Sequence, residues 1–413
     1  MRYVNILLFF ILSFDNCFTQ WTLSNSGTTQ NLNTVFFSNA ITGYAGGENG
    51  VILKTTNNGS NWNVLNAGST NNINSIYFHS STTGLACGSS GQILMTTNEG
   101  NNWNNISSGV TDDLHAISFY NNTNGVCSGG SGTLMFTTNG GLSWTVSKNG
   151  FLSVFYGIHM ITATDAYACG VNTIFQPLVA KTTNGGVNWD YSTFYLNGNE
   201  GNLRDVNFIS ANEGFAVSNV FDGQGGISFT SDGGVNWSTQ LFPDALNSID
   251  FIGANTGYAV GYNGFILKTS DNGITWNVQQ SGVSNTLRGV NFTDAANGFI
   301  VGDDGVIFKT TNGGMTAVNY LNEISPESFL LSQNYPNPFN PNTVISYQLT
   351  VSNFVILKVY DASGKEVAIL VNQKQSPGSY SVDFNAVNFP SGIYFYRIKT
   401  EGFTETKSMM LLK

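Results

Sequence analysis

The sequence predicts an all-β protein: a seven-bladed β-propeller followed by a small immunoglobulin-like β-sandwich. The first observation is a repeated segment, TTNNGSNW at residues 55–62, whose close copies recur until residue 317. The second is the spacing of the copies, about 40 residues, which is typical of four-stranded propeller blades. The third is composition, with 10% charged residues, 13% aromatic residues and 47 glycines, which favours short strands joined by tight turns.

Each copy of the segment has the residues of a tight turn between two strands. In the first copy we expect Asn57 to hydrogen-bond the backbone two residues on and Gly59 to supply a positive φ. The tryptophan that ends the segment would anchor the outgoing strand. The predicted structural positions are Trp21, Trp62, Trp103, Trp144, Trp189, Trp237 and Trp276, and the last copy ends at Ala317 instead.

Four strands can be placed in each repeat. In the first repeat they are Leu32–Phe37, Gly43–Gly47, residues 51–56 and a strand that opens at Trp62. Apolar residues alternate in the first of these strands, as at Val35 and Phe37, and the same alternation returns in every repeat. Such period-two positions build the face that packs between neighbouring blades.

The two ends of the repeat array complement each other. The seventh copy lacks its tryptophan, while Trp21 begins an unpaired strand before the first repeat. We therefore predict that Trp21 supplies the outermost strand of the seventh blade, which closes the ring and removes two exposed strand edges. The propeller would cover residues 20–317.

The segments outside the propeller differ from it in composition. Residues 1–19 combine Arg2 with an apolar run at residues 6–14, too short to span a bilayer, and predict a secretory signal peptide. Six of the eight prolines lie from Pro326 onward. Residues 318–328 are expected to form a linker, and residues 329–413 a separate sandwich of short strands.

Charge and cysteine usage limit the possible partners. Residues 21–317 contain 17 acidic and 7 basic side chains, which argues against nucleic acid or an anionic membrane as the partner. After signal removal three cysteines remain, Cys87, Cys127 and Cys169, in successive repeats. Their odd number favours buried free thiols over a disulfide framework. No cofactor or metal is expected, because the three histidines are dispersed and no phosphate loop is present.

The repeats carry a family resemblance. The spacing [ST]-x-[DN]-x-G-x-x-W resembles the Asp-box, or bacterial neuraminidase repeat. Residues 21–317 are similar to the seven-bladed propellers of the photosystem II assembly and stability factor, which combine an LRxVxF-like strand with TTNGGxxW; here that strand reads LRDVNF at 203–208 and LRGVNF at 287–292. The resemblance implies the fold but not a photosynthetic role.

The C-terminal segment resembles the type A sorting domain of the type IX secretion system. The matching stretches are NYPNPFNPNT at 334–343, KVYDASGKEV at 358–367, PSGIYFYR at 390–397 and the terminal KSMMLLK. This resemblance implies that the type IX machinery is a partner through residues 329–413. It also implies a location outside the cell or on the outer-membrane surface of a Gram-negative bacterium.

Strand parity predicts where a ligand site lies. The repeated turn joins the third and fourth strands, so loops between the second and third strands and between blades lie on the opposite end of the propeller. The longest such loops are near 172–177, 193–202 and 219–225, in adjacent blades four and five. Because functional residues gather on loops, we expect the ligand surface on this end.

The same end receives the start of each innermost strand. The equivalent positions there are Asn33, Asn74, His115, Tyr156, Arg204, Asn247 and Arg288. A ring of hydrogen-bonding side chains beside aromatic loops is a plausible ligand surface. The predicted binding residues are His115, Tyr156, Arg204, Arg288, Tyr191 and Tyr195. The alternative is that these are solvated rim residues, with the arginines capping carbonyls or pairing with Asp205.

The predicted function is non-catalytic binding of a protein or polysaccharide by an exported propeller. A sialidase would need three arginines around its substrate carboxylate, and the propeller contains two. The alternative function is a polysaccharide-degrading glycoside hydrolase with a carboxylate pair on the loop-inserted face. The acidic candidates on that face are Asp112, Asp113, Asp205, Asp303 and Asp304, of which the last two sit in a turn ending at Gly305.

Overall fold

The structure is a computed structural model that describes residues 21–147, 152–314, 329–351, 353–375 and 378–412. The chain divides into two compact units, Met1–Ala317 and Val318–Lys413. The predicted signal peptide, 1–19, and the predicted linker, 318–328, lie outside the described residues. Within the described part, no helix is long and apolar enough to cross a membrane.

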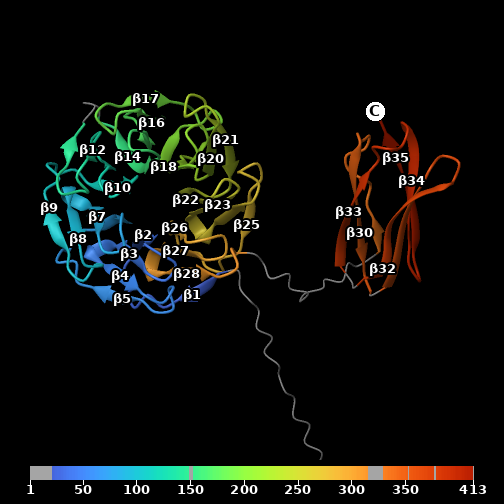
Figure 1. Cartoon of the computed structure of the whole chain (residues 1–413), viewed down its shortest axis with the longest axis horizontal. Coiled ribbons are helices and arrows are strands. Elements are labelled where there is room, and N and C mark those ends of the chain that lie inside the picture. The colour runs from blue at the N-terminus through green and yellow to red at the C-terminus, as the bar shows by residue number, and fades with distance from the viewer. Residues whose placement is uncertain (1–20, 148–151, 315–328, 352, 376–377, 413) are drawn as a thin grey trace, which may run out of the picture. The chain divides into compact units, whose positions relative to one another are not determined.

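The first unit is a ring of seven four-stranded antiparallel sheets, each a propeller blade whose first strand is innermost (Figure 1). Blade 1 contains β2 (Leu32–Phe37), β3 (Gly43–Gly47), β4 (Ile52–Thr55) and β5 (Asn63–Leu65). Blade 2 contains β6 (Ile73–Phe78), β7 (Gly84–Gly88), β8 (Ile93–Thr96) and β9 (Asn104–Ile106). Blade 3 contains β10 (Leu114–Phe119), β11 (Gly125–Gly129), β12 (Leu134–Thr137) and β13 (Thr145–Val146).

The remaining blades repeat this order. Blade 4 contains β14 (Val154–Met160), β15 (Ala166–Val171), β16 (Pro177–Thr182) and β17 (Asp190–Thr193). Blade 5 contains β18 (Gly201–Phe208), β19 (Gly214–Val220), β20 (Gly225–Thr230) and β21 (Ser238–Phe242). Blade 6 contains β22 (Leu246–Ile252), β23 (Thr256–Gly261), β24 (Ile266–Thr269) and β25 (Asn277–Gln279). Blade 7 contains β26 (Leu287–Phe292), β27 (Gly298–Gly302), β28 (Ile307–Thr310) and β1 (Thr22–Ser24).

Four single-turn 3-10 helices join second to third strands. They are η1 (Glu48–Gly50), η2 (Ser89–Gly91), η3 (Tyr262–Gly264) and η4 (Asp303–Gly305).

The closure predicted for the ring is confirmed. β1 pairs antiparallel with β28, with Thr22 opposite Lys309, as Asn63 lies opposite Lys54 in blade 1. Trp21 is buried and makes edge contacts with Tyr258 and with Phe292. The N-terminal strand therefore takes the place that the seventh turn leaves without a tryptophan.

The repeated turn is held by side-chain hydrogen bonds. The hydroxyl of Thr55 accepts the N–H groups of Asn57 and Gly59 at 3.3 and 3.0 Å. The carboxamide oxygen of Asn57 accepts the N–H of Asn61 at 3.0 Å, four residues on. The predicted reach of two residues was therefore wrong. Asn58 and Gly59 both have positive φ, and these two left-handed residues turn the chain back toward the Asn57 side chain.

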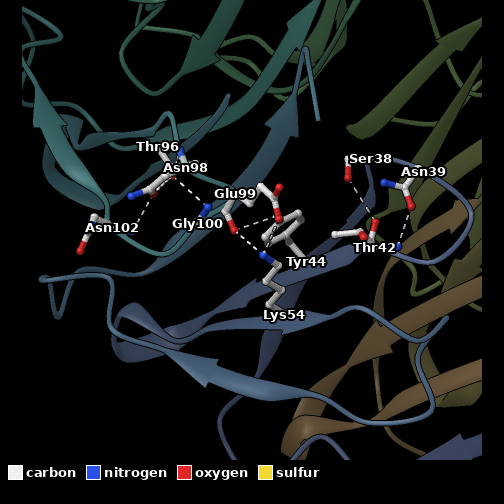
Figure 2. A network of polar contacts seen from close by, with 10 residues as sticks. All are labelled: Ser38, Asn39, Thr42, Tyr44, Lys54, Thr96, Asn98, Glu99, Gly100 and Asn102. Carbon is white, nitrogen blue, oxygen red and sulfur yellow. Dashed lines mark hydrogen bonds and ion pairs between the residues drawn. The ribbon is translucent and has the colours of Figure 1, made fainter. Parts of the chain in front are cut away.

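In several blades the turn also accepts hydrogen bonds from the preceding blade. Figure 2 shows the turn of blade 2, where the carbonyl oxygen of Glu99 accepts hydrogen bonds from the Tyr44 hydroxyl and the Lys54 ammonium of blade 1 at 3.0 and 2.8 Å. The same arrangement joins Tyr167 and Lys181 of blade 4 to the Gly233 carbonyl of blade 5. The turn motif is therefore part of the scaffold between blades.

The second unit is a sandwich of two antiparallel sheets. One sheet has the order β29 (Leu330–Leu331), β30 (Asn342–Leu349), β33 (Gly378–Asn385). The other has the order β32 (Glu366–Gln375), β31 (Asn353–Tyr360), β34 (Gly392–Lys399), β35 (Thr404–Leu411). Their inward residues form one core that includes Ile345, Leu357 and Tyr396. The immunoglobulin-like sandwich prediction is confirmed.

Candidate functional site

All seven residues of the predicted ring line one cavity of ≈ 460 Å³ at the end of the central channel. They are Asn33, Asn74, His115, Tyr156, Arg204, Asn247 and Arg288. Each lies at a β-bulge of its innermost strand, where the pairing with the second strand skips one residue. A bulge re-aims the extra side chain. Because all seven blades have this bulge, one polar residue of each blade faces the cavity.

Three asparagines of this ring are used to join blades. The side-chain NH2 groups of Asn33, Asn74 and Asn247 donate to the carbonyls of Ile73, Leu114 and Leu287 at 3.0, 2.8 and 2.9 Å. Each bond runs to the innermost strand of the next blade, whose backbone has no further strand to pair with. For these residues, a structural role is directly visible.

Two residues further along the innermost strands also accept hydrogen bonds from the next blade. Asp250 accepts the N–H of Phe292 at 2.7 Å, and Nδ1 of His159 accepts the N–H of Phe208 at 2.9 Å. Burial lowers the pKa of His159 to about 4, so its ring is neutral at pH 7 and able to accept this bond.

The ring residues of blades 3, 4 and 5 form a stack. The Arg204 guanidinium lies over the Tyr156 ring, 4.2 Å from its centroid, and the His115 ring lies 5.2 Å from the Tyr156 ring. Burial, and then the charge of Arg204, lower the pKa of His115 to about 4. At neutral pH, the positive charge of the stack therefore belongs to Arg204 alone.

The two arginines of the ring differ in their partners. Arg288 forms an ion pair with Asp303 of η4 and contacts the Asn33 side-chain oxygen at 3.5 Å. Within the part of the chain that the structure describes, the guanidinium of Arg204 has no hydrogen-bond or ion-pair partner. The alternative pairing of the arginines with Asp205 is not observed. Arg204 is thus a positively charged group with free donors in the cavity.

Two aspartates of the channel are half-buried, and their pKa values lie above the ordinary value. Asp205 accepts the N–H groups of Val206 and Ile249 and the Ser248 hydroxyl, while burial raises its pKa to about 6. Burial, and then the charge of Asp205, raise the pKa of Asp250 to about 7. Asp205 lines the cavity and Asp250 does not.

The longest loops come from blades 4 and 5, and they contact each other. The Gln176 amide donates to the Tyr195 hydroxyl at 2.8 Å, and the rings of Phe175 and Phe221 meet edge to face at 5.4 Å. The exposed large side chains here are Ile174 (63%), Phe175 (57%), Phe221 (55%) and Tyr195 (52%). We name these four residues the aromatic rim. Exposed apolar side chains gathered in this way mark interaction sites.

Two predicted binding residues lie away from the cavity. Tyr191 is on β17, the outermost strand of blade 4, and its ring lies 6.3 Å from that of Phe155. Tyr195 belongs to the aromatic rim instead. The sequence reasoning did not select Ile174 and Phe175, although two adjacent apolar residues inside a predicted exposed loop were a visible signal.

The other candidate carboxylates are engaged by the loops. Asp112 accepts the Thr133 hydroxyl at 3.0 Å, and Asp113 accepts the N–H of Ser90 at 2.8 Å. Asp304 accepts the Asn285 amide at 2.8 Å, and Asp303 pairs with Arg288. In the described ranges, no group of three or more histidine, cysteine or acidic residues is placed to hold a metal ion.

Comparison with known families identifies two segments. Residues 333–412 match the family model of the secretion system C-terminal sorting domain, and residues 240–319 match that of the photosynthesis system II assembly factor YCF48. The chain therefore carries a secretion sorting domain behind a propeller with YCF48-like repeats. No match was found among curated protein sequences.

Solved structures agree on the fold. YCF48 bound to D1 peptide has 19% identity and a TM-score of 0.58, with 71% of this chain and 98% of that chain covered. YCF48 from Cyanidioschyzon merolae has 17% identity and a TM-score of 0.58, with 70% and 98% covered. PorZ, a surface component of the type-IX secretion system of Porphyromonas gingivalis, has 13% identity and a TM-score of 0.51, with 91% and 59% covered.

Proposed function

We propose that this protein is a cargo of the type IX secretion system whose propeller binds a partner outside the cell or on the outer-membrane surface. The sorting domain at residues 333–412 supports the export route. Binding would occur at the cavity and the aromatic rim, which lie on the same end of the propeller. Tyr262 and Asp303 support this placement, because they belong to loops between second and third strands and also line the cavity. Three residues of the aromatic rim, Ile174, Phe175 and Phe221, lie in loops of the same kind, and Tyr195 lies in the connection between blades 4 and 5.

The observation that carries the proposal is the free guanidinium of Arg204. Stacking on the tyrosine ring holds the guanidinium in place, and its paired N–H groups can bind a carboxylate through two parallel hydrogen bonds. Among proteins and polysaccharides we favour a protein with an acidic segment, because exposed phenylalanines such as Phe175 and Phe221 resemble the aromatic anchors of protein interfaces. YCF48, which shares the propeller fold, has been solved with a peptide bound.

Binding to immobilised peptide and polysaccharide arrays tests the proposal. Acidic peptides should bind to the wild-type chain, and Arg204→Ala should weaken binding at least about tenfold, the effect expected from losing one close charge pair. Arg288→Ala is the matched control and should weaken binding less, because Asp303 already neutralises Arg288. Equal affinity of wild type and Arg204→Ala would contradict the proposed site.

The same arrays separate the alternatives. Selective binding of acidic polysaccharides would identify a glycan partner in place of a protein. Release of reducing ends from any polysaccharide would instead establish the glycoside hydrolase. An Arg204→Lys variant keeps the charge but loses the planar donor pair, so an intermediate affinity would show that geometry contributes as well as charge.

A further inference from the structure

Three cysteines in the described residues lie on second strands of consecutive blades. Cys87 is on β7 of blade 2, Cys127 on β11 of blade 3 and Cys169 on β15 of blade 4. All three thiols are buried and free in the structure. Their strands are equivalent; Cys87 and Cys169 occupy the same position in their strands, and Cys127 occupies the neighbouring position.

The pairing register shows which way each cysteine points. Cys87 lies opposite Ser75, whereas Cys127 lies opposite Ile117, which is one position further along the innermost strand. Because side chains alternate along a strand, the two cysteines point to opposite sides of their own blades. Gly46 is equivalent to Cys87 in blade 1, and a Cβ built there would lie 2.6 Å from Cγ2 of Ile73 in the next blade. Cys87 therefore points toward blade 3, and Cys127 points back toward blade 2.

Packing places the two thiols in the same interface. Cys87 and Cys127 belong to one buried cluster between blades 2 and 3, together with Leu85, Leu114 and Ile117. Burial, and then the neighbouring Cys87 thiol, raise the pKa of Cys127. Cys169 belongs to a different cluster, which contains no second cysteine among the residues that the structure describes.

The equivalent pair of positions can be compared around the ring. Every interface between neighbouring blades has one residue at the position of Cys87 and one, in the next blade, at the position of Cys127. In the other six interfaces these two residues are Val301 and Ala45, Gly46 and Ala86, Ser128 and Ala168, Cys169 and Ala216, Val217 and Ala259, and Val260 and Ile300. The position of Cys127 is thus alanine in most blades. A cysteine replaces this alanine at the interface where a cysteine already faces it.

We propose that Cys87 and Cys127 form a disulfide that joins blades 2 and 3 in the exported protein. An exported chain leaves the reducing cytoplasm, so a protein disulfide of an oxidising compartment can serve as the oxidant. One cysteine thiolate attacks that disulfide to give a mixed disulfide, and the second thiolate displaces the oxidant's thiolate. The two cysteines together lose two protons and two electrons, and the oxidant is reduced to two thiols. The exchange occurs during folding, before β7 and β11 are buried.

Peptide mapping without reducing agent tests the proposal. Cleavage after Lys54, Glu99 and Lys148 places Cys87 and Cys127 on separate peptides. In protein recovered from the culture medium or cell surface, these peptides should remain joined, with a mass lower by two hydrogens than their sum. Alkylation of the unfolded, unreduced chain should modify Cys169 and neither of the other two. Modification of all three cysteines, or a link that includes Cys169, would overturn the proposal.

Two variants complete the test. Cys127→Ala introduces the residue that most blades carry there, and its unfolding temperature should no longer fall when reductant is added. Cys169→Ala is the matched control, because it also removes a buried thiol but should retain the link and the response to reductant. Refolding the purified chain in a glutathione redox buffer separates the chemistry from the export route: absence of the link there overturns the pairing whatever the route.

Discussion

At the scale of single residues, the channel is organised by side chains that complete the hydrogen bonds of neighbouring backbones. The innermost strands have no inner partner, so their free N–H and C=O groups need side-chain partners. Asn74 supplies a donor to Leu114, and Asp250 supplies an acceptor to Phe292. Arg204 stands apart, because its guanidinium contacts an aromatic ring and faces an open cavity.

The half-buried Asp250 should make the free energy of unfolding fall as the pH rises, opposite to most aspartates. Its pKa is about 7 in the folded chain, against an ordinary value of 3.8, so the folded chain binds this proton more tightly between these pH values. Its contribution to the free energy of unfolding therefore falls as the pH rises through this window. Asp250→Asn keeps an acceptor for Phe292, and should raise the free energy of unfolding at pH 8 by about 1 kcal/mol or more, with a smaller effect at pH 5.

Chemical denaturation at the two pH values measures this effect. Asp271 provides a control of opposite sign, because hydrogen bonds from Thr275 lower its pKa in the turn motif. Asp271→Asn should therefore lower stability at pH 8. The same free-energy change for Asp250→Asn at pH 5 and pH 8 would show that the carboxyl group does not hold its proton in the channel.

At the scale of the elements, the propeller is a set of strands whose bounds follow closely from local sequence. Alternating apolar residues and the turn motif predicted β2 and β3 to the residue. The bulge at Asn33 was not predicted, because it arises from the pairing of two strands and leaves no mark in either one. The location of the long loops followed from strand parity, but the hydrogen-bond partners of the ring residues depend on the adjacent blade, which local patterns do not describe.

The short strand β1 offers the sharpest test of element-scale packing. Trp21→Ala removes an indole that packs against Tyr258 and Phe292, and should destabilise the propeller by about 3 to 5 kcal/mol, as for other large core truncations. Thermal unfolding followed by calorimetry measures the loss. Leu23→Ala, on the exposed side of the same strand, is the control and should change the midpoint little. Similar midpoints for both variants would mean that β1 does not stabilise the ring.

At the scale of the whole molecule, the two units have separate cores and separate sequence signals. The propeller core is divided among clusters between blades, while the sandwich has one core of its own. The sorting domain was recognisable from contiguous stretches such as PSGIYFYR, since such a motif is read locally. The candidate ligand surface is assembled from seven distant positions. Strand parity placed these positions on one end of the propeller, where they line one cavity, whereas Tyr191 lies on the outermost strand of its blade, because the partners of each position depend on the neighbouring blades.

Removing the second unit should separate folding from export. A chain that ends at residue 317 retains every propeller strand, so its thermal midpoint should equal that of the propeller transition in the full chain. It should, however, be retained inside the cell envelope, because it lacks the sorting domain. Calorimetry and cell fractionation check the two outcomes. A lower midpoint would show that the sandwich stabilises the propeller.

The pairing of β1 with β28 also sets the order of events when the protein is made. Thr22 is among the first propeller residues to leave the ribosome, and its partner Lys309 is among the last. A chain that is still being synthesised therefore cannot complete its ring. The ring can close only after the last propeller strand, β28, has been synthesised, shortly before the sorting domain.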